Sequence, residues 1–160
     1  MLGHSAGANL ILGLMMRVRQ RGLNQPAGAI LLSPPTDLTG AGPSVTTNLQ
    51  RDAMFTPIIW PWVRQCYLGG ACPSDPEASP LLGDWSGLAP LHFHVSDSEL
   101  VLDDSRLAVE RARAAGTSAD LTVWSDLPHS FAFIDILPEA ARCRVQIAQF
   151  ANVVLAGARN

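Results

Sequence analysis

The sequence opens with a pattern that can hold a nucleophilic serine. Residues 3–7 read Gly-His-Ser-Ala-Gly and fit Gly-x-Ser-x-Gly, in which the serine stands on a tight strand-to-helix turn with its hydroxyl exposed. We expect the two glycines to leave room where the backbone folds back and to tolerate strained dihedral angles. Ser5 is therefore the candidate nucleophile, and the backbone N–H of Ala6 is a candidate donor to an oxyanion.

A serine hydroxyl is a poor nucleophile until a base takes its proton, and that base must be held by an acid. The candidate base is His129, which lies in a loop after a predicted strand at 120–124. His92 and His94 alternate along another predicted strand, so they share one face and we expect them to be buried or half-buried. No third ligand accompanies this pair, and we expect no metal site there.

Two carboxylates, Asp97 and Glu99, follow the predicted strand at 91–95. Either carboxylate can accept a hydrogen bond from the imidazole N–H of the base, and their chemistry alone does not choose between them. Asp103 and Asp104 open the next predicted helix. We expect them to cap that helix, where their charge meets the positive end of its dipole.

Helices and strands alternate along most of the chain. We expect helices at 5–22, 103–115 and 138–156, and strands at 27–32, 91–95 and 120–124. Such alternation predicts an α/β fold with a parallel sheet and right-handed crossovers. Because the candidate serine, acid and histidine all follow strands, they should converge on one edge of that sheet, where ligand sites gather.

Residues 40–90 interrupt this alternation with a proline-rich segment that is too long for an ordinary connection. We expect one or two short helices within 52–68, broken at Pro57 and Pro61. The segment holds three of the four tryptophans, Trp60, Trp62 and Trp85. We predict that it covers a site, and its aromatic residues either line a pocket there or form a small core of the segment itself.

The composition limits the class of protein. We expect the 160 residues to form one domain, and 48% of them are hydrophobic and 16% charged. The formal net charge is -3, and the sequence has no basic patch for nucleic acid. No apolar run can span a membrane, and the start lacks the basic-then-apolar layout of a secretion signal, so we expect a cytoplasmic protein. The three cysteines lack Cys-x-x-Cys spacing, which favours packing thiols over a disulfide framework or a zinc site. They are Cys66, Cys72 and Cys143.

Four segments together resemble the bacterial hormone-sensitive-lipase-like esterases of the α/β-hydrolase superfamily. They are residues 3–7, 33–39, 99–104 and 128–131. The likeness covers essentially the whole chain and implies the C-terminal half of an α/β-hydrolase fold, a parallel sheet flanked by helices. It also implies that residues 40–90 are the internal part of the family's cap. Family members hydrolyse carboxylic esters, mostly with short or medium acyl chains, so the implied partner is a small-molecule ester and no cofactor is required.

The resemblance assigns roles to individual residues. The family's serine and histidine correspond to Ser5 and His129. Its acid usually opens an Asp-Pro-Leu-x-Asp motif, and laying that motif on 99–103 without gaps puts the acid at Glu99. The resemblance therefore favours Glu99 over Asp97.

The sequence also departs from the family pattern. The residue before the nucleophile is often Asp in the family and is His4 here, which changes the electrostatics beside the serine. The His-Gly-Gly-Gly oxyanion loop and the first strands of the family lie upstream of the elbow, and only Met1 and Leu2 precede it here. We therefore expect a C-terminal part of a family member with an exposed sheet edge. The chain should either form a homodimer through that edge or fold poorly because of it.

Three functions remain open from the sequence. The first is a serine carboxylesterase with a Ser-acid-His triad. The second is a catalytically inert fragment or a small-molecule-binding homologue of the same fold, although retention of both Ser5 and His129 argues against a binding homologue. The third is another hydrolase on this fold, such as an amidase, a peptidase or a thioesterase.

Overall fold

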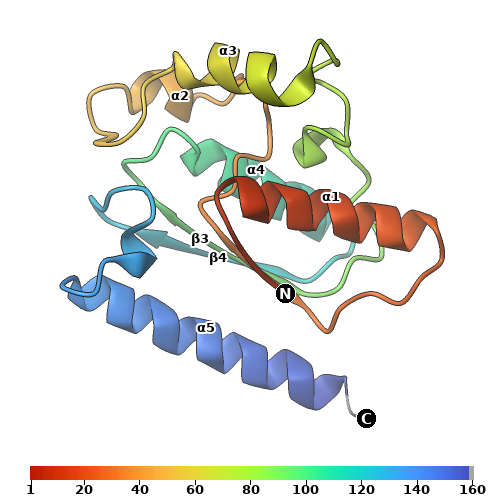
Figure 1. Cartoon of the computed structure of the whole chain (residues 1–160). Coiled ribbons are helices and arrows are strands. Elements are labelled where there is room, and N and C mark those ends of the chain that lie inside the picture. Colours follow the sequence, from red (N-terminus) through yellow and green to blue (C-terminus); the bar gives the residue numbers. More distant parts are fainter. Residues whose placement is uncertain (159–160) are drawn as a thin grey trace.

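A four-stranded sheet organises the molecule in the computed structural model, which describes residues 1–158 (Figure 1). The strands are β1 (Leu2–His4), β2 (Ala29–Leu32), β3 (Leu91–Ser96) and β4 (Ala119–Trp124). They lie in the order β1-β2-β3-β4, and every neighbouring pair is parallel. The parallel α/β sheet predicted from the sequence is confirmed.

Helices cover both faces of this sheet. Helices α1 (Ala6–Gln20) and α4 (Leu102–Ala114) lie on one face, and α5 (Pro138–Gly157) lies on the other (Figure 1). Because side chains alternate along a strand, Leu31 and Phe93 join the core beneath α1 and α4, whereas Ile30 and Leu32 join the core beneath α5. The three predicted helices are confirmed, with ends close to the expected positions.

The two strand histidines face α5. His94 is fully buried and His92 is half-buried, with their ring centroids 4.2 Å apart, so the expectation of burial is confirmed. The Trp124 indole N–H donates a hydrogen bond of 3.3 Å to Nδ1 of His94. Within residues 1–158 no three His, Cys, Asp or Glu side chains come together as a metal site would require.

The strand before the elbow is short but present. Leu2, Gly3 and His4 pair with three residues of β2, and the N-terminal ammonium of Met1 donates to the carbonyl oxygen of Gly28 over 2.6 Å. The motif itself thus supplies two of the three strand residues, which the sequence reading did not foresee. Along its outer edge β1 has no neighbouring strand among the described residues, and the Leu2 side chain is half exposed.

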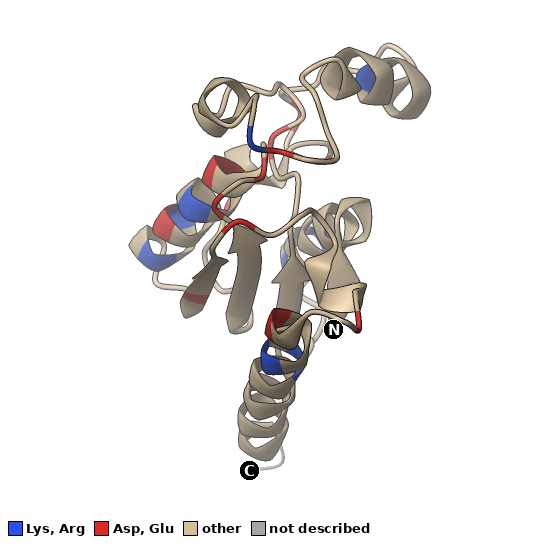
Figure 2. Ribbon diagram, turned by 90° about the vertical axis from the view of Figure 1, so that its left-hand side faces the viewer, with Lys and Arg blue, Asp and Glu red and all other residues tan. Residues whose placement is uncertain are grey.

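Residues 40–82 form a layer over the edge toward which the strands point (Figure 2), whereas residues 83–90 run along α1 to the start of β3. The layer contains α2 (Ser44–Thr47), α3 (Ile59–Val63), a π-helical turn η1 (Arg64–Leu68) and a 3₁₀ turn η2 (Pro80–Leu82). Pro57 precedes α3 as expected, but the predicted break at Pro61 is wrong. Pro61 lies in the first turn of α3, where a backbone N–H has no helical partner, so the helix continues through it.

Two of the three tryptophans of this segment take the expected roles, and Trp85 takes neither. Trp60 is buried and packs with Leu38 and Val101 in a local core, and it also borders a cavity. Trp62 is exposed at the same cavity, whereas Trp85 belongs to the main core beneath α1. Trp60 therefore serves as core and as cavity wall at once.

The cysteines do not all pack in the interior. Cys143 is buried beneath the sheet, and burial raises the pKa of its thiol to about 11. Cys66 and Cys72 are exposed, and Cys66 borders the cavity, so the packing role expected for them is wrong. None of the helices described, including the 20-residue α5, is long and apolar enough to cross a membrane.

Candidate active site

Ser5 occupies a strained turn between β1 and α1. Its backbone has φ 51° and ψ -127°, in the left-handed half of dihedral space that non-glycine residues rarely enter. The turn is held by a hydrogen bond from Ser5 N to the carbonyl oxygen of Leu32 (2.8 Å) and by one from Ala8 N to the carbonyl oxygen of Ser5 (2.9 Å). These contacts with the surrounding structure hold Ser5 in its strained conformation, as is common where a side chain must be presented for chemistry.

The two glycines of the motif differ in their importance. A Cβ atom on Gly3 would lie 2.7 Å from Cα of Ala8 and 2.8 Å from the carbonyl oxygen of Gly7, so no larger residue fits. A Cβ atom on Gly7 would meet nothing within 4 Å. Neither glycine has a positive φ, because Ser5 itself adopts the strained conformation. The expected relief of clashes is therefore confirmed for Gly3 and wrong for Gly7, and the expected strained dihedral angles are found at neither glycine.

Glu99 and His129 form a buried pair. Oε2 of Glu99 lies 2.6 Å from Nδ1 of His129, and the two side chains are 1% and 4% exposed. The other carboxylate oxygen, Oε1, accepts hydrogen bonds from Ser33 Oγ (2.9 Å) and from the backbone N–H of Ser96 (2.7 Å). These contacts fix the carboxylate, and a fixed carboxylate on Nδ1 directs the other ring nitrogen away from it.

Asp97 lies elsewhere, at the surface. Arg51 donates a hydrogen bond of 2.9 Å to Oδ1 of Asp97, and the backbone N–H of Asp126 donates to the same oxygen over 2.9 Å. Of the two carboxylates left open by the sequence, the structure brings Glu99 to His129 and engages Asp97 with Arg51.

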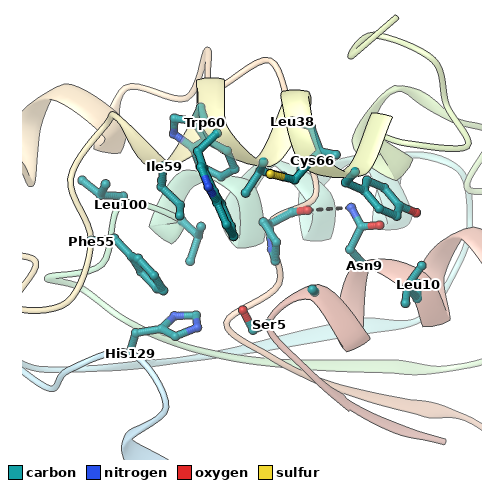
Figure 3. A pocket seen from close by; sticks show the side chains of 16 residues that line it. Ser5, Asn9, Leu10, Leu38, Phe55, Ile59, Trp60, Cys66, Leu100 and His129 are labelled. Carbon is teal, nitrogen blue, oxygen red and sulfur yellow. Dashed lines mark hydrogen bonds between the residues drawn. The ribbon is translucent and has the colours of Figure 1, made fainter. Parts of the chain in front are cut away.

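The free nitrogen of His129 faces the serine. Nε2 is buried and has no hydrogen-bond partner among the described residues, and the imidazole ring points toward Ser5 (Figure 3). Ser5, Ala6 and His129 border one cavity of about 550 Å³. An imidazole with an acid on one nitrogen and an open second nitrogen beside a serine can act as a general base.

The rest of the cavity wall is mainly apolar. Helix α1, the loop after β2, the covering layer of residues 40–82 and the loop after β3 contribute Leu10, Leu38, Phe55, Ile59, Trp60 and Val101. The Phe55 ring packs edge-on against His129 with centroids 4.8 Å apart. The cavity therefore joins a polar floor at the serine to an apolar chamber under the covering layer (Figure 3).

The geometry can be compared with known proteins. Residues 1–133 match the profile of a family described as having the alpha/beta hydrolase fold. The chain belongs to the α/β-hydrolase family. An esterase of Acinetobacter venetianus is 33% identical over 94% of this chain, and an acetyl-hydrolase of Streptomyces hygroscopicus is 35% identical over 88%.

A solved structure shows to which family within the α/β hydrolases this chain belongs. An esterase of the bacterial hormone-sensitive lipase family is 40% identical, superposes with a TM-score of 0.90 and is matched over 93% of this chain and 50% of that one. The chain therefore belongs to the bacterial hormone-sensitive lipase family, which its motifs resemble. It spans about half the length of the relatives it matches, 50% of the Acinetobacter esterase and 47% of the Streptomyces acetyl-hydrolase.

Two acidic residues of this α/β hydrolase play only part of the role expected for them. Asp103 and Asp104 lie in the first turn of α4, but neither side chain caps the helix. Oδ2 of Asp103 instead accepts from the backbone N–H of Ser44 (2.7 Å), and Oδ2 of Asp104 accepts from that of Asp37 (3.0 Å). Burial, together with the nearby charge of Asp37, raises the pKa of Asp104 to about 8. The two carboxyl groups thus connect the start of α4 to the covering layer at Ser44 and to the loop after β2 at Asp37.

Sequence reasoning missed two residues that support the site. Ser33 donates to Glu99, and its backbone has φ 48° at the end of β2. Asn9, one turn after Ser5 on α1, donates to the carbonyl oxygens of Pro35 (2.7 Å) and Ala78 (3.0 Å) (Figure 3). Ser33 could have been suspected because it follows a buried strand directly. Asn9 gave no signal, because its partners lie 26 and 69 residues away.

Proposed function

We propose that this chain hydrolyses carboxylic esters, with Ser5 as nucleophile, His129 as general base and Glu99 as the acid that orients His129. One observation carries the proposal. His129 has its Nδ1 on a buried carboxylate while its Nε2 is buried, unpaired within the described residues and directed at Ser5. The names of its relatives, esterase and acetyl-hydrolase, support ester chemistry.

The first half of the reaction forms an acyl-enzyme. Nε2 of His129 takes the proton of the Ser5 hydroxyl as Oγ attacks the ester carbonyl carbon, and the carbonyl oxygen becomes an oxyanion. The Ala6 N–H opens helix α1, where a backbone donor has no helical partner and the dipole favours negative charge, so it donates to that oxyanion. The intermediate collapses, the bond to the alcohol oxygen breaks, and His129 gives its proton to the departing alcohol.

The second half releases the acid. A water molecule attacks the acyl carbon while His129 takes one of its protons, and the new intermediate collapses to a carboxylic acid. Ser5 regains its proton from His129. Through both halves Glu99 stabilises the imidazolium that forms next to it, and Ser33 and Ser96 hold Glu99 in place.

The cavity wall supports a choice of acyl group. Next to the polar floor, the apolar side chains of Leu38, Phe55 and Trp60 suit a hydrocarbon chain and offer few partners for a charged one. We therefore assign short and medium acyl esters as the substrate class of this site.

The test is hydrolysis of p-nitrophenyl butyrate by the purified chain and by Ser5→Ala. We expect Ser5→Ala to lower the rate by at least about 10³-fold, because a triad loses nearly all turnover with its nucleophile. The matching p-nitroanilide is the second substrate, and we expect it to be cleaved much more slowly. Undiminished ester hydrolysis in Ser5→Ala would overturn the proposal, and faster cleavage of the anilide would favour an amidase.

A further inference from the structure

The loop that carries His129 has to cross the sheet. This base loop (residues 125–130) follows β4, which lies at the opposite end of the sheet from β1 and the elbow. Strands β2 and β3 lie between them. A loop that spans two strands needs an anchor at each end if its histidine is to stay within hydrogen-bond reach of the serine.

The near end of the base loop is anchored to the loop after β3. The backbone N–H of Leu127 donates to Ser96 Oγ (2.9 Å), and Ser98 Oγ donates to the carbonyl oxygen of Leu127 (2.8 Å). The bond between His129 and Glu99 lies at the same end of the crossing. These contacts place His129 relative to the acid, but none of them reaches the strand that carries the nucleophile.

The far end is anchored by His4. Nε2 of His4 and Oγ of Ser130 lie 2.9 Å apart and share a hydrogen bond across 126 residues of sequence. In the part of the chain described, it is the one side-chain hydrogen bond between β1 and the base loop. Its two ends are the neighbours of the reacting residues, since His4 precedes Ser5 and Ser130 follows His129.

Packing around His4 holds its ring in one orientation relative to Ser130. Its ring centroid lies 5.1 Å from that of His129 and 5.0 Å from that of Phe133, which packs edge-on. Ser130 has φ 69°, so the chain turns sharply right after the base. Burial and the neighbouring His129 lower the pKa of His4, with Glu99 acting in the opposite direction, which favours a neutral ring beside an imidazole that must gain a proton.

We propose that His4 is a positioning residue for the general base, which fixes the His129 loop to the nucleophile strand through its hydrogen bond with Ser130. The inference rests on the proposed function. It gives a purpose to the residue at which this chain departs from the family pattern. His4 has no hydrogen bond to Ser5, Glu99 or His129 among the described residues, and it acts through Ser130 on the separation of Nε2 from Ser5.

The test is a double-mutant cycle on ester hydrolysis. Ser130→Gly removes the hydroxyl and accepts the positive φ, and His4→Phe keeps a ring against Phe133 but loses the nitrogen. We expect each to lower kcat about 3- to 10-fold with KM nearly unchanged, as the loss of one neutral hydrogen bond allows. Because both remove the same bond, the double variant should lose no more than either single one.

A rescue variant and a spectroscopic readout separate positioning from general stability. Ser130→Asn also tolerates a positive φ and returns a polar partner, so it should recover part of kcat. In ¹⁵N NMR of the imidazole rings, the His4 Nε2 shift should move in Ser130→Gly. Unchanged kcat in both single variants, or losses that multiply in the double variant, would overturn the inference. If Ser5→Ala still hydrolyses the ester, the proposed function fails instead.

Discussion

The Glu99 carboxylate lies 2.6 Å from Nδ1 of His129, whereas Asp97, two residues earlier, accepts from Arg51 at the surface. The two acids thus have separate environments. Glu99 is 1% exposed and also accepts from Ser33 and Ser96, so it cannot turn away from the imidazole without leaving buried partners unpaired. Asp97 instead joins the covering layer, through Arg51, to the loop after β3.

This difference predicts opposite outcomes for two matched substitutions. Glu99→Gln should lower kcat for p-nitrophenyl butyrate by about 10⁴-fold, because an amide favours the wrong imidazole tautomer and cannot stabilise the imidazolium. Asp97→Asn should change kcat less than about 3-fold, since a surface ion pair contributes little. Equal losses in the two variants would contradict the assignment of the acid.

Gly3 and Gly7 should also respond differently to alanine. Gly3→Ala forces a Cβ to within 2.7 Å of the α1 backbone, and we expect a loss of about 2–3 kcal/mol in the free energy of unfolding. Gly7→Ala meets open space in the first turn of α1 and should be neutral or gain up to about 0.5 kcal/mol from helix propensity. Urea unfolding of both variants measures this, and a destabilised Gly7→Ala would show that the elbow needs both glycines.

His94 should make the fold sensitive to acid. Burial, reinforced by His92, lowers its pKa to about 3, whereas the unfolded side chain titrates near 6.5. Below pH 6.5 the unfolded chain therefore binds a proton that the folded chain does not. The His94 contribution to the free energy of unfolding should therefore fall as pH decreases from 6.5 to 4, by up to about 1.4 kcal/mol per pH unit.

The variant His94→Gln tests this dependence, because an amide does not titrate. Relative to that of the unsubstituted chain, its free energy of unfolding, measured with urea at several pH values, should rise as pH decreases from 6.5 to 4. The control is His92→Gln, which removes a half-buried ring next to it and should change the slope less. An unchanged slope in His94→Gln would exclude His94 as its source.

Asp104 should act with the opposite sign, in a pH window that overlaps that of His94 and extends above it. Its folded pKa of about 8 lies above the usual 3.8, so between these values the folded carboxyl retains a proton that the unfolded one releases. This contribution to stability is full below pH 3.8 and is lost as pH rises through 8. Between pH 7.25 and 8, where His94 is largely neutral in both states, the unsubstituted chain should lose stability with rising pH.

Asp104→Asn keeps the shape and an acceptor for Asp37 N, so it should remove that loss and be the more stable chain at pH 8. Asp103→Asn is the control, because its carboxylate is partly exposed and pairs with Arg106. Urea unfolding at pH 6.5, 7.25 and 8 compares the three chains. A slope in Asp104→Asn equal to that of the unsubstituted chain would rule out a buried, protonated Asp104.

Much of the architecture could be predicted because it depends on local patterns. The run Ala29–Leu32 is apolar at every position and is buried at every position, as a central parallel strand requires. The break expected at Pro61 failed because proline disrupts a helix only beyond its first turn, and the helix start was not visible in the sequence. The cap role expected for Asp104 failed because its partner, Asp37, lies 67 residues away.

By itself the sequence determined which residue types could do chemistry and which edge of the sheet would hold them. Ser5, Glu99 and His129 each follow a strand, and parallel strands end at one edge. Only the tertiary structure decided how these residues meet. The approach of Glu99 to His129, the free Nε2 and the bond from His4 to Ser130 join residues 30 to 126 positions apart. Propensity and periodicity act over a few residues, so contacts at such separation depend on how the whole chain packs.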